Sequence, residues 1–118
     1  MDKAWVRSSL AECYARLEAM RLINMRIAAD LERERMDVAL SSTTKVFGSE
    51  SAIEILRKLA AVIGANGSMR SGSAATLLQG ELEYELRSSV TLTFGGGTNE
   101  VQRELIAQFG LGMPRAQR

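Results

Sequence analysis

Apolar side chains recur at helical spacing along most of this 118-residue chain. The first stripe, in residues 2–35, repeats at steps of three and four and comprises Val6, Leu10, Cys13, Leu17, Met20, Ile27 and Leu31. Such steps place side chains on one face of a helix. Trp5 and Tyr14 lie off that stripe, which indicates more than one packing neighbour, as inside a bundle. We therefore expect one long helix here, with Asp2 as its cap.

A second helix is predicted from near Asp37 to about Ile63, because Val46, Ile53, Leu56, Leu59, Ala60 and Ile63 form a second stripe. Gly48 lies inside this pattern, where glycine costs ~1 kcal/mol relative to alanine. We interpret Gly48 as a place where another helix passes closely. The helix should stop at Gly64-Ala65-Asn66-Gly67, since Gly or Asn can adopt the left-handed capping conformation. The Ser- and Gly-rich residues 68–73 predict a loop.

A shorter helix is predicted over residues 74–89, from a narrow stripe made of Leu78, Leu82, Leu86 and Val90. Residues 91–94 are expected to form a short extended link. A fourth helix is predicted from Asn99 to about Phe109. The sequence has no alternating pattern long enough to build a sheet. The fold class that we predict is all-α, an antiparallel helical bundle, with residues 1–118 as a single domain.

Composition favours a globular protein, with 46% apolar and 25% charged residues. Fifteen basic and fourteen acidic side chains nearly balance, so no strong field favours nucleic acid as a partner. Cys13 is the single cysteine, so an internal disulfide is impossible, and a lone thiol fits a reducing compartment. No apolar run approaches ~18 residues and no signal-peptide pattern opens the chain. We therefore expect a cytoplasmic location without a membrane span.

Histidine is absent from the chain. Its absence excludes Ser-His-Asp and Cys-His catalysis and the usual imidazole metal sites within these residues. An acidic run contains Glu81, Glu83 and Glu85, and paired carboxylates can perform acid–base chemistry. Alternate residues of a helix do not share a face, however, so this run is interpreted as solvated surface. No metal site is predicted.

Three consecutive glycines, Gly95–Gly97, precede the fourth predicted helix. They free the backbone to adopt positive φ and to approach a ligand. Thr98 or Asn99 can then cap the helix, and from an Asn99 cap Gln102 could reach back. A Gly-rich turn before a helix can hold a phosphate or an oxyanion. The alternative is a flexible turn between packed helices. The Gly64–Gly67 turn likewise is a helix C-cap or approaches a cofactor phosphate.

The longer string Phe94-Gly-Gly-Gly-Thr-Asn-Glu-Val-Gln-Arg103, followed by Gly110-Leu-Gly-Met-Pro-Arg115, resembles the C-terminal end of acyl-CoA dehydrogenases of the actinobacterial-type branch. The resemblance continues through Lys45-Val-Phe-Gly48 and Ile63-Gly-Ala-Asn-Gly67, and covers nearly the whole chain. It implies the family's C-terminal domain, here an incomplete four-helix bundle. In the family this domain packs against a copy in another subunit and helps to enclose FAD. The N-terminal and middle domains are expected to lie outside this chain.

The resemblance also implies roles for particular residues. Gly64 and Gly67 match a turn that meets the cofactor from a neighbouring subunit, although Ala65 replaces a usual glycine and Ala61 stands where a cofactor-contacting Gln often occurs. The further FAD-binding positions are Gly97, Thr98 and Glu100.

Gly96 matches a position where several branches carry the catalytic glutamate, which removes the α-proton while the β-hydrogen leaves as hydride to the flavin. Glycine cannot accept a proton, but its N–H can polarise the thioester carbonyl. In other branches the base lies on an earlier helix, outside this chain. No catalytic side chain is therefore assigned, and we expect the chain alone to be inactive.

Two functions remain open at this point. The chain is either the bundle portion of an FAD-dependent acyl-CoA dehydrogenase, acting within a larger chain or within a homo- or hetero-oligomer, or a non-catalytic interaction module derived from that family. The trio Thr98-Asn99-Glu100 favours the first function, because packing alone does not require it. Fatty acyl and steroid side-chain substrates are both compatible with the resemblance.

Overall fold

The computed structural model describes residues 3–74 and 78–115, and all the regular elements in these ranges are helical. The α-helices are α1 (Ala4–Glu32), α2 (Val38–Ile63), α3 (Glu81–Ser88) and α4 (Asn99–Leu105). Single-turn segments connect or extend them, namely η1 (Gly64–Ser68), η2 (Leu78–Gly80), η3 (Ser89–Thr93) and the π-helical η4 (Ile106–Gly110). The all-α prediction is confirmed.

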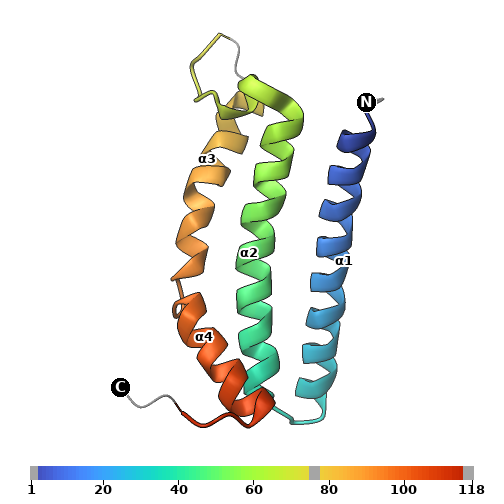
Figure 1. The fold of residues 1–118 in the computed structure, drawn as a ribbon, viewed down its shortest axis with the longest axis vertical. Helices are drawn as coiled ribbons and strands as arrows, with labels where there is room; N and C mark the ends of the chain where they lie inside the picture. Colours follow the sequence, from blue (N-terminus) through green and yellow to red (C-terminus); the bar gives the residue numbers. More distant parts are fainter. Residues whose placement is uncertain (1–2, 75–77, 116–118) are drawn as a thin grey trace.

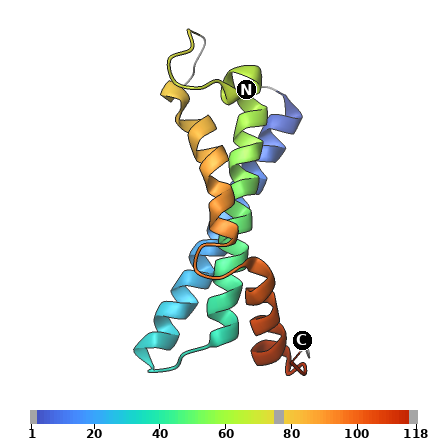
Figure 2. The ribbon, with the colours of Figure 1, turned by 90° about the vertical axis from the view of Figure 1, so that its left-hand side faces the viewer.

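Helix α2 lies in the middle of the molecule, between α1 on one side and a column formed by α3 and α4 on the other (Figure 1). Turned by 90°, the helices cross at a narrow waist and diverge toward both ends (Figure 2). The chain therefore forms an elongated body of 53 × 32 × 25 Å. Because α2 contacts every other α-helix, it is the element that positions the rest.

Helix α2 begins and ends where the sequence predicted, whereas helix α1 is shorter than predicted. Asp37 is the N-cap of α2, where its side chain accepts a hydrogen bond from the Leu40 N–H at 2.9 Å. The helix ends at Gly64, as its C-cap. Helix α1 begins after Lys3, whose side chain makes no capping bond, and the predicted cap Asp2 lies outside the described residues. Helix α1 ends at Glu32.

The predicted close passage at Gly48 is confirmed. A Cβ atom on Gly48 would lie 2.8 Å from Cε of Met20 on α1, so the two helices meet where α2 has no side chain. Among residues 3–74 and 78–115, few apolar residues are buried, and they are Val6, Cys13, Val46, Ile53 and Leu82. Helices arranged around a single central helix bury little apolar surface area in a shared core.

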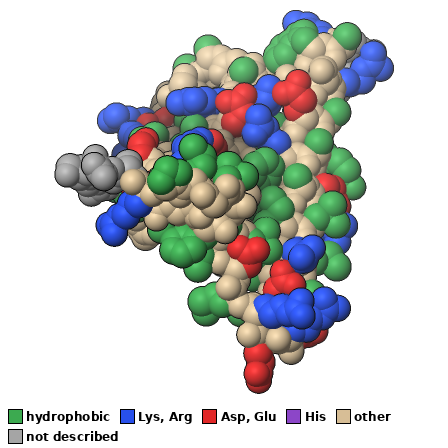
Figure 3. All heavy atoms as spheres, turned by 60° about the horizontal axis from the view of Figure 1, so that its bottom comes forward, with side chains coloured by type: hydrophobic (Ala, Val, Ile, Leu, Met, Phe, Trp, Pro, Cys, Tyr) green, Lys and Arg blue, Asp and Glu red, His purple; other side chains and the backbone are tan. Residues whose placement is uncertain are grey.

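Many large apolar side chains remain exposed. Tyr14 is 67% exposed, and the others include Leu17, Leu22, Met25, Leu31, Leu92, Phe94, Phe109 and Leu111. Figure 3 shows hydrophobic side chains interspersed with charged ones over one such face. Soluble monomers rarely leave so many apolar groups uncovered. This surface agrees with the expected incomplete bundle.

The third helix is shorter than predicted. It was expected over residues 74–89, but α3 spans Glu81–Ser88, and residues 75–77 lie outside the described ranges. Gly80 has a left-handed backbone with φ 82°, which interrupts the helical pattern before Glu81. A Cβ atom there would lie 2.4 Å from the Ser71 backbone nitrogen, so the preceding loop packs directly on Gly80. The loop prediction holds except that Ser68 belongs to η1.

The prediction of an extended link at residues 91–94 is wrong, because residues 89–93 form the 3₁₀ segment η3. Hydroxyl groups explain its compact shape. Thr91 Oγ1 donates to the Ser88 carbonyl at 2.7 Å, and Thr93 Oγ1 donates to the Val90 carbonyl at 2.8 Å. Such local side-chain bonds compete with extended structure.

Of the two cap candidates, Thr98 is the N-cap of the fourth helix. Its Oγ1 accepts from the Val101 N–H at 3.3 Å, while Asn99 is already helical. Gln102 does not complete a capping box, since its Nε2 donates to the Gly96 carbonyl at 3.3 Å. The predicted stretch to Phe109 is helical, but its last turn is the π-helical η4.

Candidate functional site

The glycine turn exposes two backbone donors. Gly95 N–H donates to the Thr91 carbonyl at 3.0 Å, whereas the N–H groups of Gly96 and Gly97 make no hydrogen bond within the described residues. Both of these glycines have positive φ, 71° and 99°. A Cβ atom on Gly96 would meet nothing within 4 Å, but one on Gly97 would lie 2.9 Å from Nε2 of Gln102. The turn can therefore offer two N–H groups to a ligand's oxygen.

The start of α4 is already occupied by groups of the chain itself. Thr98 Oγ1 accepts the hydrogen bond from the Val101 N–H. The Glu100 carboxylate is stabilised first by its own backbone N–H and then by the Thr98 hydroxyl, so the pKa of Glu100 lies below its ordinary value. An anionic carboxylate at this helix end opposes a phosphate there. The donors of Gly96 and Gly97 consequently suit a carbonyl oxygen better than a phosphate.

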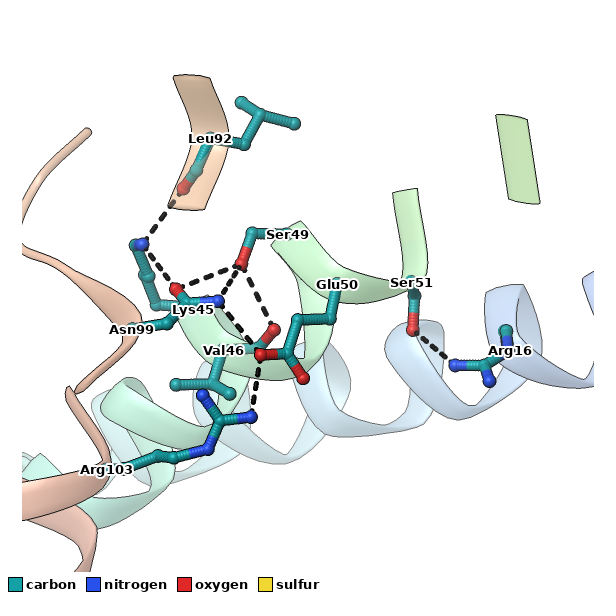
Figure 4. A network of polar contacts seen from close by, with 9 residues as sticks. All are labelled: Arg16, Lys45, Val46, Ser49, Glu50, Ser51, Leu92, Asn99 and Arg103. Atoms are coloured by element: carbon teal, nitrogen blue, oxygen red, sulfur yellow. Dashed lines mark hydrogen bonds and ion pairs between the residues drawn. The ribbon is translucent and has the colours of Figure 1, made fainter. Parts of the chain in front are cut away.

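Asn99 anchors the turn to α2. It is 3% exposed, and its Nδ2 donates to Ser49 Oγ at 3.0 Å and to Glu50 Oε1 at 3.1 Å. Its Oδ1 accepts from Lys45 Nζ at 2.6 Å (Figure 4). The side chain is thus satisfied on both its donor and acceptor sides. Within the trio Thr98-Asn99-Glu100, the presence of Asn99 is therefore explained by its hydrogen bonds to α2.

Two further contacts tie the same region together. Lys45 Nζ also donates to the Leu92 carbonyl at 2.9 Å, and Arg103 Nη2 lies 2.6 Å from Glu50 Oε1. Neither Ser49 nor Glu50 was identified from the sequence, because their partners lie about fifty positions away. The only signal was Lys45-Val-Phe-Gly48, which entered as part of the family resemblance.

An open groove runs beside the turn. Its volume is about 430 Å³, and it is lined by Met20, Thr44, Lys45, Gly48, Ser49, Leu92 and Gly95. Its position brings α1, α2 and the glycine turn to one surface. Apart from Lys45 and the hydroxyl groups, the lining offers apolar atoms, which suit a hydrocarbon or ring system.

The second glycine turn is a helix C-cap. Gly64 has φ 78°, and its N–H donates to the Ala60 carbonyl. Gly67 is buried, and a Cβ atom there would lie 3.0 Å from the Ala60 carbonyl oxygen and 3.3 Å from Cβ of Ile63. The local structure therefore explains why both positions are glycine. Their cofactor role stays a prediction.

The structure does not bring the two glycine turns together. Gly64 follows the end of α2, while Lys45, which binds both flanks of the other turn, lies about 28 Å from Gly64 along the helix axis, at 1.5 Å per residue. Figure 1 shows this separation, with η1 at one end of α2 and the start of α4 nearer the other. Within this chain, the five predicted cofactor positions form two sites.

The interpretation of the acidic run as solvated surface is confirmed for Glu81 and Glu85 but not for Glu83, whose side chain is only 15% exposed. Glu81 and Glu85 are exposed, and Glu83 pairs with Arg87 at 2.9 Å. The hydrogen bond from Arg87 is the main reason why the pKa of Glu83 is lowered. Across the described residues, no cluster of three His, Cys, Asp or Glu is arranged to hold a metal ion. No helix in those ranges is long and apolar enough to cross a membrane.

Comparison with known proteins adds a family to this geometry. Residues 1–111 match the family model described as acyl-CoA dehydrogenase, C-terminal domain. Over its full length the chain is 41% identical to acyl-CoA dehydrogenase FadE26 and 34% identical to acyl-CoA dehydrogenase FadE29, both from Mycobacterium tuberculosis strain ATCC 25618 / H37Rv. The chain spans 30% of the length of each of these relatives.

Solved structures share the fold. The Tcur3481-Tcur3483 steroid ACAD superposes with a TM-score of 0.91 at 42% identity, over 98% of this chain and 30% of that one. The ChsE4-ChsE5 complex from Mycobacterium tuberculosis superposes with a TM-score of 0.89 at 43% identity, again over 98% of this chain and 30% of that one.

Proposed function

Because this chain belongs to the acyl-CoA dehydrogenase family, as its C-terminal helical domain, we propose that it is the bundle portion of an FAD-dependent enzyme. The proposed reaction is the α,β-dehydrogenation of an acyl-CoA thioester. The chain's contribution is to hold flavin and to form an oligomer interface. The relatives are more than three times as long, so we propose that the complete activity belongs to a larger chain or to a larger assembly.

One observation carries this proposal. The N–H groups of Gly96 and Gly97 are without a partner in the described chain, on a turn that Asn99 anchors firmly to α2. Both glycines are exposed, so these two N–H groups are accessible to an acceptor oxygen of a ligand. In the proposed enzyme the Gly96 N–H donates to the thioester carbonyl oxygen, where negative charge develops during removal of the α-proton.

The cofactor contacts at this turn are assigned to Gly97, Thr98 and Glu100. When bound, FAD supplies the acceptor for the hydride that leaves the β-carbon. The lowered pKa of Glu100 keeps this carboxylate ionised, so it suits a hydroxyl or N–H of the nucleotide as donor. Gly64 and Gly67, at the other end of α2, are proposed to meet a flavin held by a neighbouring subunit.

We assign no catalytic base to this chain at the turn, because Gly96 has no side chain, the sequence contains no histidine, and the Glu100 carboxylate is assigned to the nucleotide. The base is proposed to come from another part of the assembly. Similarity to the ChsE4-ChsE5 complex and the exposed apolar side chains support a hetero-oligomer as the working state. Similarity to a steroid ACAD supports a steroid-linked acyl-CoA as the substrate class. We also propose a cytoplasmic location.

The test is to purify the assembly that contains this chain, with a neighbouring encoded dehydrogenase subunit where there is one. A flavin absorbance spectrum that bleaches when an acyl-CoA is added under anaerobic conditions supports the enzyme function. The alternative is a non-catalytic interaction module that keeps the bundle interface. It predicts a stable, colourless complex that acquires no flavin when FAD is supplied, and that result would reject the enzyme function.

A further inference from the structure

We propose that Lys45 is a positioning residue that sets the geometry of the Gly95–Gly97 turn. Its Nζ donates to the Leu92 carbonyl at 2.9 Å and to Asn99 Oδ1 at 2.6 Å. Leu92 precedes the turn and Asn99 follows it. A single ammonium group on α2 therefore holds both flanks of the turn (Figure 4).

The Lys45 ammonium donates to these two neutral oxygens, and it also attracts the Glu100 carboxylate at the start of α4. The pKa of Glu100 is lowered mainly by its own backbone N–H and to a smaller extent by Lys45. Within the described residues, no carboxylate lies within 4.0 Å of its Nζ, and the nearby Glu50 is paired with Arg103 at 2.6 Å. Lys45 is thus not half of a salt bridge between α2 and another helix. Hydrogen bonds from an ionised donor are about twice as strong as neutral ones, so the clamp is a strong local constraint.

The turn has few constraints of its own. Its three glycines allow a wide range of backbone angles. The internal bonds are those from Gly95 N–H to Thr91 and from the Gln102 side chain to the Gly96 carbonyl, the second at 3.3 Å. Fixing Leu92 and Asn99 on α2 restricts where the intervening N–H groups of Gly96 and Gly97 can point. The identity of the ligand at those N–H groups rests on the proposed function. The clamp, meaning the two bonds from Lys45 to Leu92 and Asn99, is independent of that function.

Lys58 provides a matched control on the same helix. Its Nζ lies 2.6 Å from Glu12 Oε2 on α1 and 3.5 Å from Glu54, and it has no contact with the glycine turn. Lys45→Met and Lys58→Met each remove one ammonium that links α2 to another element, while keeping an unbranched stem. Lys45→Arg keeps the charge and donors. Lys45→Gln, polar but too short to reach both oxygens, replaces Lys45→Met if that variant does not fold.

The experiment measures amide hydrogen exchange in the purified assembly that contains this chain. The reporters are the amides of Gly95 and Gln102, which donate to the Thr91 and Thr98 carbonyls at 3.0 Å on either side of the turn. Losing a bond from a charged group changes an opening equilibrium on the order of tenfold. Lys45→Met should lower protection at both reporters by about that factor, with α2 unchanged. Lys45→Arg should restore most of it, and Lys58→Met should leave both reporters unchanged.

Equal protection of both reporters in Lys45→Met and the unsubstituted protein would overturn the proposal, as would an equal loss in Lys58→Met. Flavin titration of the same variants supplies a second readout. A clamp predicts that Lys45→Met raises the flavin dissociation constant on the order of tenfold, with rescue by Lys45→Arg. If no variant binds flavin, the proposed function fails, and the exchange result alone decides the role of Lys45.

Discussion

Gly48 and Met20 meet at the contact between α1 and α2, where a Cβ atom on Gly48 would lie 2.8 Å from the Met20 terminal methyl carbon. The atom in the way is the end of a flexible side chain. A small group can therefore be accommodated by a shift of Met20, whereas a branched group would press on the helix itself.

Substitutions at Gly48 should separate these two effects. We expect Gly48→Ala to stay within about 1 kcal/mol of the unsubstituted protein, since the gain in helix propensity offsets the shift of Met20. Gly48→Val should lower the free energy of unfolding by about 1–3 kcal/mol. Urea denaturation measures both. Equal stabilities for the two variants would contradict the close contact.

Asn99 is predicted to be a major stabilising side chain. Asn99→Ala removes the acceptor of Lys45 and the donor to Ser49 and Glu50, so that within the described residues each of these keeps only its bond to Leu92, Val46 or Arg103, respectively. The expected loss is about 1–3 kcal/mol. Asn66→Ala, at an exposed asparagine, is the control and should change stability by less than about 0.5 kcal/mol. Similar losses in both variants would show that the Asn99 network contributes little.

Glu100 makes the start of α4 sensitive to acid. Its pKa is lowered from the ordinary value of 4.5, mainly by its own backbone N–H and next by the Thr98 hydroxyl. A lowered folded-state pKa stabilises the fold above pH 4.5, and this contribution is lost as the pH falls through the folded-state value. An NMR titration of the Glu100 carboxyl carbon should give a midpoint below 4.5, and Thr98→Val should raise it. A midpoint at or above 4.5 in the unsubstituted protein would refute this assignment.

The sequence predicted the parts of the fold that local chemistry determines. Asp37 and Gly64 mark the ends of α2 because a cap and a positive-φ glycine act within a few residues. The start of α3 was missed because it depends on the contact between Gly80 and the Ser71 backbone. The shape of residues 91–94 differs from the predicted extended link because Thr91 and Thr93 donate to carbonyl groups three residues earlier, which favours a 3₁₀ turn.

The candidate site divides in the same way. The glycine turn and the Thr98 cap were visible in the sequence, since both are local features. The Asn99 anchor was not, because its partners Lys45 and Ser49 come from α2 and become neighbours only in the folded chain. Residues such as Glu100 and Gly64 could be assigned a ligand only through the family resemblance.

The purified chain alone should show no dehydrogenase activity, even with FAD added. Backbone donors at Gly96 and Gly97 can stabilise charge by several kcal/mol, but they cannot accept the α-proton. An assay with an acyl-CoA and a dye as electron acceptor checks this, and turnover by the chain alone would contradict it. Gly96→Glu tests this further in the assembly: a Cβ atom at Gly96 meets nothing within 4 Å in this chain, although its φ of 71° strains any residue other than glycine. This variant should raise activity only where the assembly supplies no base of its own.

The central claim is that the glycine turn takes part in holding flavin, and flavin affinity measured on paired glycine variants tests it most directly. Gly97 has φ 99°, and a Cβ atom there would meet the Gln102 side chain; Gly112 also has positive φ, 65°, but lies in the tail with open space around it. Either alanine variant carries a backbone strain of roughly 1–2 kcal/mol. Fluorescence titration of the purified assembly with FAD should show weaker binding by about tenfold or more for Gly97→Ala. Gly112→Ala should bind like the unsubstituted protein. Equal flavin affinity in the two variants, with both assemblies intact, would contradict the account.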